Sequence, residues 1–589
     1  MPDSKNSGTY DLESLRLPSL KAGALRAFAG ALALPVVGRV VAAKLAKDAG
    51  LAALAAARFE DPPRGHPLVP SGHSPEALPA RPPVGVPAPG VALGASAPGD
   101  TSAPGDTSAP RDPSASAPSS AARPHGAFVS VSDLHARFRA GLTDPVRVAS
   151  SALDAIERRQ ATLHAMIAFD RDDALRVAEA AAERWRAGTP RGPLDGVPVV
   201  VKDELDMVPY PTTVGTTFLG KAPATRDATT VARLRSAGAV LLGKANMHEI
   251  GINPTGANNH YGYVANPYGL RRDAGGSSSG SAAAVAAGFC PVAVGADGGG
   301  SIRVPASLCG VVGLKPTYGR VSEAGAAPLC WSVAHVGPIA ATVADAALAY
   351  AVMAGPDPRD PNTVAQPPLD ARLDERAVLR IGVFRPWFEH AEAPIVAACD
   401  AALQTLVASG TAEYRSIEIS HLNAYRVAHV VTILSEMAAS MENHPESLSA
   451  LGPHAQVNLR AAHRFTATDY VRAQRARAHA MAQLERIFQT VDVIATPTTA
   501  VVAPTIPVVD PADAWSDLTT TTELMRFCYM TNLTGHPSLS VPCGYTEDGL
   551  PIGLQLIAPH WHEARLFHVG AQVEAMTTRY APPDYHALV

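Results

Sequence analysis

Cysteine is scarce in this sequence, and the cysteines present are not arranged in pairs. Six cysteines occur in 589 residues, and none forms a Cys-x-x-Cys motif with another. A disulfide framework and a structural zinc site are therefore not expected, and a reducing compartment fits this pattern best.

A long apolar segment is missing near the N-terminus. The first 19 residues are polar, without the basic start and apolar stretch of a secretory signal peptide. The longest uncharged apolar run near the N-terminus, 27–38, lies between Arg26 and Arg39 and is shorter than the roughly 20 residues that a bilayer span needs. We expect no signal peptide and no transmembrane span, and a protein that is cytoplasmic or lies on a membrane surface.

An excess of positive charge is missing too. The formal net charge is -5, which gives no general reason to expect nucleic-acid binding. Hydrophobic residues make up 47% of the chain and charged residues 17%, a balance typical of a globular protein with a large core.

Residues 20–58 have a helical apolar pattern that Pro35 should kink or divide. Basic residues outnumber the single acid Asp48 across 21–50. Two interpretations stay open: an interfacial helix pair that touches anionic lipid, or alanine-rich helices packed on the body of the protein or on a partner subunit. The apolar positions at three- and four-residue spacing are Leu25, Phe28, Leu32, Val36 and Val40.

Residues 60–126 are rich in proline and alanine, and no aromatic residue lies between Phe59 and Phe128. Such a segment buries too little apolar area to offset its ordering entropy, so we predict a disordered linker. The predicted organisation is an N-terminal helical extension over 1–59, this linker over 60–126, and a catalytic domain over 127–589.

The catalytic region is predicted to be a single large α/β domain with a mixed central sheet covered by helices on both faces. An Asp548-Gly549 turn should join strands 538–543 and 551–557 in a hairpin. Helices are predicted over 145–160, 170–188 and 228–237, with a last amphipathic helix at 566–576, and further strands over 197–202, 239–242, 379–384 and 491–496.

Lys202 ends the apolar strand predicted at 197–202. Burial away from water disfavours a charged ammonium group, so a lysine in this position could serve as a base. Taken alone, a lysine at a strand end is more often a solvated surface group.

A glycine- and serine-rich loop, Gly275-Gly-Ser-Ser-Ser-Gly-Ser281, opens a helical run of alanines. Such a loop presents backbone N–H groups and hydroxyls to a ligand. A phosphate-binding loop is excluded because Ser281 stands where that motif needs lysine. The nucleophile elbow of α/β-hydrolases fits Gly276 to Gly280 but lacks the strand that should precede it.

A second glycine-rich turn, Asp297-Gly-Gly-Gly-Ser301-Ile-Arg303, can bring consecutive backbone N–H groups to one point. It is a candidate oxyanion hole beside a candidate nucleophile, Ser301. A tight structural turn is the alternative. Metal is not expected at His248-Glu249, because Ile252 replaces the second histidine of a zinc motif, and no histidine segment favours a Ser-His-Asp hydrolase.

Taken together, these segments resemble the amidase signature family in their order and in the 24-residue separation of Ser277 and Ser301. The match covers roughly 128–580. Other segments that resemble this family are 243–249, 310–320, 540–545 and 549–555.

The resemblance implies an acyl-enzyme mechanism with a Ser-Ser-Lys triad. Lys202 would be an uncharged general base, Ser277 a proton relay with a cis peptide bond, and Ser301 the nucleophile. The family needs neither metal nor organic cofactor. The backbone N–H groups implied for the oxyanion hole are those of Gly298, Gly299, Gly300 and Ser301, with support from Ser278, Asp297 and Arg303.

Three stretches are similar to the plant-type fatty acid amide hydrolases of this family: 275–281, 297–301 and 522–527, together with 31–50 in the extension. This implies fatty acid amides such as N-acylethanolamines as substrates, membrane-surface contact and a homodimer. Linker 60–126 departs from that subgroup. The residues that could line an acyl channel are Met247, Leu524, Met525, Phe527 and Cys528, with ordinary helix core as the equal alternative.

Three other functions remain open. One is a general amidase for small aliphatic or aryl amides, and another is a glutamine-hydrolysing amidotransferase subunit that needs a partner protein. The third is an inactive scaffold that keeps only the fold.

Overall fold

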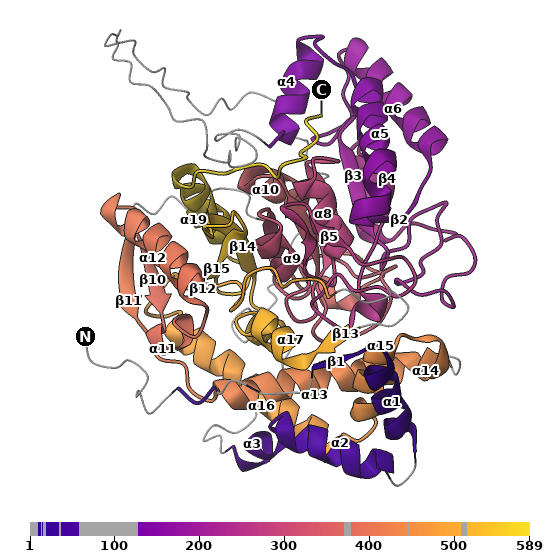
Figure 1. Ribbon diagram of the computed structural model, residues 1–589. Helices are drawn as coiled ribbons and strands as arrows, with labels where there is room; N and C mark the ends of the chain where they lie inside the picture. The colour runs from indigo at the N-terminus through magenta and orange to yellow at the C-terminus, as the bar shows by residue number, and fades with distance from the viewer. Residues whose placement is uncertain are drawn as a thin grey trace, which may run out of the picture.

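A computed structural model describes residues 10–12, 15, 19–34, 37–57, 128–369, 378–444, 447–507 and 515–588 (Figure 1). The predicted linker over 60–126 lies outside the described residues. Its predicted disorder therefore stays a prediction.

The core of the fold is an 11-stranded mixed sheet with the order β11-β10-β12-β15-β14-β8-β9-β7-β3-β4-β2. Strands β3, β4 and β7 run parallel to one another, whereas β9, β14 and β15 pair antiparallel with their neighbours. Along the chain the sheet strands are β2 Met166–Phe169, β3 Pro198–Lys202, β4 Val240–Ala245, β7 Val292–Ala296, β8 Val312–Lys315, β9 Val336–Ala340, β10 Leu379–Val383, β11 Ala412–Ser416, β12 Val493–Pro497, β14 Ser538–Tyr545 and β15 Pro551–Ile557.

Helices cover this sheet on both faces, as predicted. Successive side chains of a strand point to opposite faces. Leu539 of β14 lies against Gly570 of α19, whereas the neighbouring Ser540 lies on the side of Ser307 in α9. The helices of the catalytic region are α4 Val131–Arg139, α5 Pro145–Leu163, α6 Arg171–Arg186, α7 Thr229–Ser236, α8 Ser279–Ala286, α9 Arg303–Leu308, α10 Val343–Met353, α11 Arg385–Phe388, α12 Ala393–Ala408, α13 Leu422–Met441, α14 Ser447–Ala450, α15 Pro453–Ala462, α16 Ala467–Ile487, α17 Leu518–Met525, α18 Tyr529–Thr534 and α19 Glu563–Met576.

The predicted hairpin is present, and β14 and β15 pair antiparallel from Ser538–Ile557 to Tyr545–Pro551. Gly549 adopts a φ of 81° in its turn, a conformation that glycine adopts without strain. Asp144 and Asp170 cap α5 and α6 by accepting hydrogen bonds from backbone N–H groups. The predicted helices and strands of the catalytic region are all present, with boundaries shifted by a few residues.

The N-terminal extension forms three helices, α1 Ala22–Ala33, α2 Val37–Asp48 and α3 Leu51–Ala56. They lie beside α13, α15 and α16 at one end of the molecule (Figure 1). Leu25, Ala29 and Leu32 of α1 pack with Val457 of α15. A short strand, β1 Ser19–Lys21, pairs antiparallel with β13 Trp515–Asp517 and fastens the extension to the segment that leads into α17.

Among the described residues, no single helix combines the length and apolar character needed to cross a bilayer. In the described part of the chain, one helix pair, Gly23–Ala33 with Val37–Leu45, reaches that length and composition together, but the pair is bent by 111°.

Candidate active site

Three segments far apart in the sequence meet at the carboxyl ends of the parallel strands β3 and β7. Lys202 is the last residue of β3, and its preceding valines are fully buried. Ser277 precedes α8, and Ser301 lies between β7 and α9. Because parallel neighbours end at the same edge of a sheet, the fold brings the carboxyl ends of β3 and β7 together.

Lys202 is buried, with 1% of its surface exposed. Its Nζ lies 2.9 Å from Ser277 Oγ and 3.2 Å from the carbonyl oxygen of Ala296. It also lies 2.7 Å from a carboxylate oxygen of Glu204. The sequence pattern around Lys202 gave no indication of Glu204.

The Ser277 loop and the Ser301 turn are joined through the backbone. Ser278 N–H donates to the carbonyl oxygen of Ser301 at 3.1 Å, and Ser278 Oγ lies 3.1 Å from the carbonyl oxygen of Ala296. The Gly276–Ser277 peptide is cis. In the described part of the chain no hydrogen bond joins the two hydroxyls of Ser277 and Ser301, so the predicted relay has its lysine contact but not its contact between the serines.

Asp297 shapes the turn that carries Ser301. One carboxylate oxygen accepts from Gly300 N–H at 2.6 Å, and the other accepts from Ile302 N–H at 3.0 Å. The N–H of Gly300 is therefore already used, which corrects the prediction that all four N–H groups face a ligand. Those of Gly298, Gly299 and Ser301 have no acceptor among the described residues.

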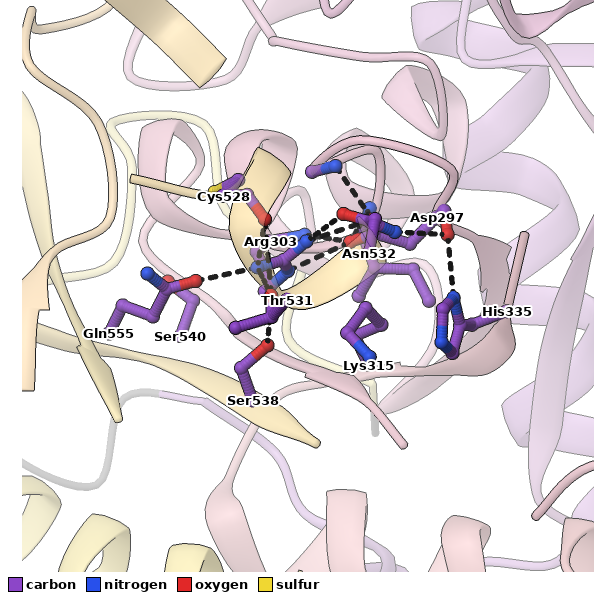
Figure 2. Close-up of polar contacts among 12 residues, drawn as sticks. Asp297, Arg303, Lys315, His335, Cys528, Thr531, Asn532, Ser538, Ser540 and Gln555 are labelled. Atoms are coloured by element: carbon purple, nitrogen blue, oxygen red, sulfur yellow. Dashed lines mark hydrogen bonds and ion pairs between the residues drawn. The ribbon is translucent and has the colours of Figure 1, made fainter. Parts of the chain in front are cut away.

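The carboxylate of Asp297 is in turn bound by Arg303 (Figure 2). Both side chains are fully buried. Arg303 Nε and Nη2 each donate to Asp297 at 3.0 Å. Burial by itself would raise the pKa of Asp297, but the charge and the hydrogen bonds of Arg303 hold it well below its usual value. The remaining donors of Arg303 reach the Cys528 carbonyl, Thr531, Asn532 and Gln555.

His429 of α13 contacts the same turn, and sequence reasoning missed it. Its Nε2 lies 2.7 Å from the carbonyl oxygen of Gly298. Burial lowers the pKa of His429 to about 4, so the ring is neutral near pH 7, and Nε2 carries the proton because a carbonyl oxygen only accepts. A side chain at Gly299 would collide with His429 and with Met525. The contact therefore fixes the turn on its α13 side.

An apolar cavity of about 180 Å³ lies on this side of the turn. Its walls come from α2, α3, α13, α15 and α17, and His429 and Met525 line it. Ile433, which also lines the cavity, would lie 3.3 Å from a side chain placed on Gly298. The cavity thus extends from the N-terminal helices to His429, Ile433 and Met525, the side chains that lie against the glycine turn.

Of the residues predicted to line an acyl channel, Met525 lines this cavity and the others do not. Leu524 and Cys528 pack into a separate buried cluster with Val304 and Leu308. Phe527 packs against Trp387, with ring centroids 5.4 Å apart. Leu524 and Met525 are neighbours in α17, so their side chains leave the helix in different directions, whereas Phe527 and Cys528 follow the end of α17 at Met525. Met247 is buried in a third cluster, beside the Ser277 loop.

No group of three His, Cys, Asp or Glu side chains in the described residues is arranged to hold a metal ion. Glu249 instead binds His260 Nε2 at 2.6 Å and the Gly452 N–H at 2.8 Å. The His248-Glu249 pair is therefore part of a buried hydrogen-bond network.

We expect Arg303→Met to lower the free energy of unfolding by about 3–5 kcal/mol, because it leaves Asp297 buried without its partner. Urea denaturation followed by tryptophan fluorescence measures this. Adding Asp297→Asn should recover part of the loss. Arg385→Met is the matched control, because its partners Glu389 and Asp400 are partly exposed, and it should cost less than about 1 kcal/mol. Equal losses of unfolding free energy for the two arginine variants would contradict the role of Arg303 as the partner of a buried carboxylate.

Comparison with known proteins finds clear relatives. A family model described as Amidase matches residues 147–567. The fatty acid amide hydrolase of Medicago truncatula is 40% identical over 460 residues, which are 76% of each chain. A glutamyl-tRNA(Gln) amidotransferase subunit from Chloroflexus aggregans is 35% identical over 481 residues, 76% of this chain and 96% of that protein. The solved structure of the native peptide amidase from Stenotrophomonas maltophilia is 30% identical, with a TM-score of 0.66, and the match covers 78% of this chain and 99% of that one.

Proposed function

The chain belongs to the amidase family and is an amide hydrolase, and we propose that it cleaves fatty acid amides through Lys202, Ser277 and Ser301. The observation that carries the proposal is the 2.9 Å contact between the buried Lys202 Nζ and Ser277 Oγ. It supports a reaction at the neighbouring turn, where the N–H groups of Gly298, Gly299 and Ser301 have no acceptor among the described residues.

In the proposed mechanism, Lys202 acts as an uncharged base. It accepts the proton of the Ser277 hydroxyl, and Ser277 takes the proton of the Ser301 hydroxyl once a substrate draws the two serines into contact. Ser301 Oγ then attacks the amide carbonyl carbon, and the carbonyl electron pair moves to oxygen. The free N–H groups of Gly298, Gly299 and Ser301 are the donors available for that oxyanion.

The leaving amine needs a proton, because an amide anion is a poor leaving group. Ser277 returns that proton and recovers it from the Lys202 ammonium, which resets the base. Water then hydrolyses the acyl-enzyme by the same route in reverse. Asp297, Arg303 and Ser278 hold the turn and the loop in place, and take no part in these steps.

We expect Ser301→Ala to reduce kcat/KM on a simple amide about a thousandfold or more. Lys202→Ala should lose a comparable factor, and the double variant little further, because the groups act as a unit. Steady-state hydrolysis of a fatty acyl p-nitroanilide measures this. Near-normal activity of Lys202→Ala at neutral pH would contradict the role of the base. Failure of a fluorophosphonate probe to label Ser301 would instead favour an inactive scaffold.

The acyl group is proposed to occupy the apolar cavity between α13, α17 and the N-terminal helices. Support comes from its lining and from its position next to the turn that precedes Ser301. The similarity to a relative named fatty acid amide hydrolase points the same way. Each methylene group buried there contributes about 0.8 kcal/mol, which is a factor of about four in kcat/KM.

We expect kcat/KM to rise steeply with acyl length against a fixed amine, and to level off once the chain fills the cavity. Val430→Trp, which places a large ring in the lining, should abolish the rise and spare acetyl amides. Val407→Trp on the exposed surface of α12 is the control. A flat profile for the unaltered protein would favour a small-amide amidase. Activity that appears only with a partner protein would favour an amidotransferase component.

The elbow between α1 and α2 is proposed to touch the membrane surface. Leu34, Val37 and Val40 there are 52%, 46% and 68% exposed, next to basic residues that include Arg39. Helix α2 also supplies Ala42 and Leu45 to the cavity wall. A lipid amide could therefore pass from the bilayer surface along α2 to the site. The homodimer that the family resemblance implies stays a prediction.

We expect the protein to sediment with vesicles of phosphatidylcholine and phosphatidylserine, and more weakly with phosphatidylcholine alone, because of the basic residues. Val40→Glu should reduce binding several-fold at unchanged activity on a short soluble amide. Val364→Glu, at another exposed apolar side chain, is the control. Equal binding by all three proteins would contradict membrane contact through this elbow.

A further inference from the structure

Three oxygen atoms lie close to Lys202 Nζ, and their number bears on whether this group acts as an ammonium or as an uncharged amine. Ser277 Oγ, the Ala296 carbonyl oxygen and a Glu204 carboxylate oxygen lie 2.9, 3.2 and 2.7 Å from Nζ. An ammonium group has three N–H donors, whereas the uncharged amine has two donors and one lone pair. The uncharged amine can therefore donate to Ala296 and Glu204 while its lone pair faces the Ser277 hydroxyl.

We propose that Glu204 is a positioning residue for this base: its carboxylate holds Lys202 Nζ against Ser277 and stabilises the ammonium that forms during attack. The inference rests on the proposed roles of Lys202 and Ser277. When the proton leaves Ser277 Oγ for Nζ, the new third N–H points back at Ser277, and the new positive charge lies beside a buried negative one. Without that carboxylate the ammonium would form in a dry site with no counter-charge.

A neighbouring ion pair shows what a purely structural pair looks like here. Lys244 Nζ lies 3.1 Å from an Asp203 carboxylate oxygen, with both side chains fully buried. Lys244 also donates to the carbonyl oxygen of Leu205 at 2.7 Å, and Asp203 accepts from the N–H of Thr213 and Gly215. This pair fastens the loop after β3 and touches neither serine. The Lys202–Glu204 pair differs because one partner contacts Ser277.

Other titratable groups lie around this pair. Burial lowers the pKa of His248 to about 4. Burial raises the pKa of Glu323 well above its usual value, with Asp360, Glu204 and Glu436 adding to the effect, and burial also raises that of the Cys330 thiol. Glu436 lies in the same region, but it accepts from Ser332 N–H and the Tyr470 hydroxyl. Among the described residues, Glu204 is the one whose carboxylate contacts Lys202 Nζ, at 2.7 Å.

The test is the pH dependence of kcat/KM for a fatty acyl p-nitroanilide, with the rate of Ser301 labelling by a fluorophosphonate as a readout that needs no leaving amine. Removing the carboxylate disfavours the ammonium, so Glu204→Gln should keep its base uncharged at lower pH. The acid limb of both profiles should move down by about one pH unit or more. The plateau of kcat/KM should fall about tenfold or more, because the ammonium formed during attack loses its partner.

Asp203→Asn is the matched control, since it removes the neighbouring buried carboxylate without touching Lys202. It should lower the melting temperature and leave the acid limb in place. Glu204→Asp, which keeps the charge on a shorter side chain, should return the limb toward that of the unaltered protein, and it serves as the test if Glu204→Gln does not fold. An unmoved limb in Glu204→Gln, or an equal shift in Asp203→Asn, would overturn the proposal.

These outcomes separate the inference from the function on which it rests. If Lys202→Ala is inactive and Glu204→Gln retains the unaltered profile, only the role of Glu204 fails. If Lys202→Ala remains active, the proposed mechanism fails with it.

Discussion

The buried ion pair of Asp297 and Arg303 is the interaction on which the site depends. A turn of three glycines has too much conformational freedom to hold N–H groups toward one point by itself. The carboxylate of Asp297 fixes two N–H groups of this turn, and Arg303 neutralises the charge of that carboxylate. Because Arg303 also reaches Gln555 of β15 and Asn532 of α18, the turn is fastened to elements more than 220 positions further along the chain.

The surroundings of Lys202 follow the same physical logic. A dry site disfavours an isolated charge, so each buried lysine near this edge of the sheet is found with oxygen acceptors. Lys244 pairs with Asp203, and Lys202 with Glu204. Burial lowers the pKa of Lys315 well below its usual value, and the nearby Arg303 lowers it further. The local balance of burial and counter-charge therefore differs from one lysine to the next, although all three lie at strand ends.

The cavity beside the glycine turn needs two parts of the chain that are far apart in sequence. Helix α13 supplies one wall and, through His429, touches Gly298. Helices α2 and α3 supply another wall, and β1 fastens them by pairing with β13 just before α17. The N-terminal extension is thus part of the wall of the cavity.

The sequence by itself determined the elements and the order of the chemical groups. Apolar periodicity located α5, α6, β3 and the β14–β15 hairpin, because those patterns are local. The motifs singled out Ser277, Ser301, Asp297 and Arg303 as candidates, because glycine- and serine-rich turns leave a local signature, and Lys202 was a candidate because it ends an apolar strand. Only the tertiary structure decided the contacts of Glu204 and His429, the pairing of β1 with β13, and the use of the Gly300 N–H by Asp297. It also decided that Met525 lines the cavity while Leu524 and Phe527 enter the core. The local sequence around each of these residues does not indicate which residue it contacts. The contacts are therefore decided by tertiary packing.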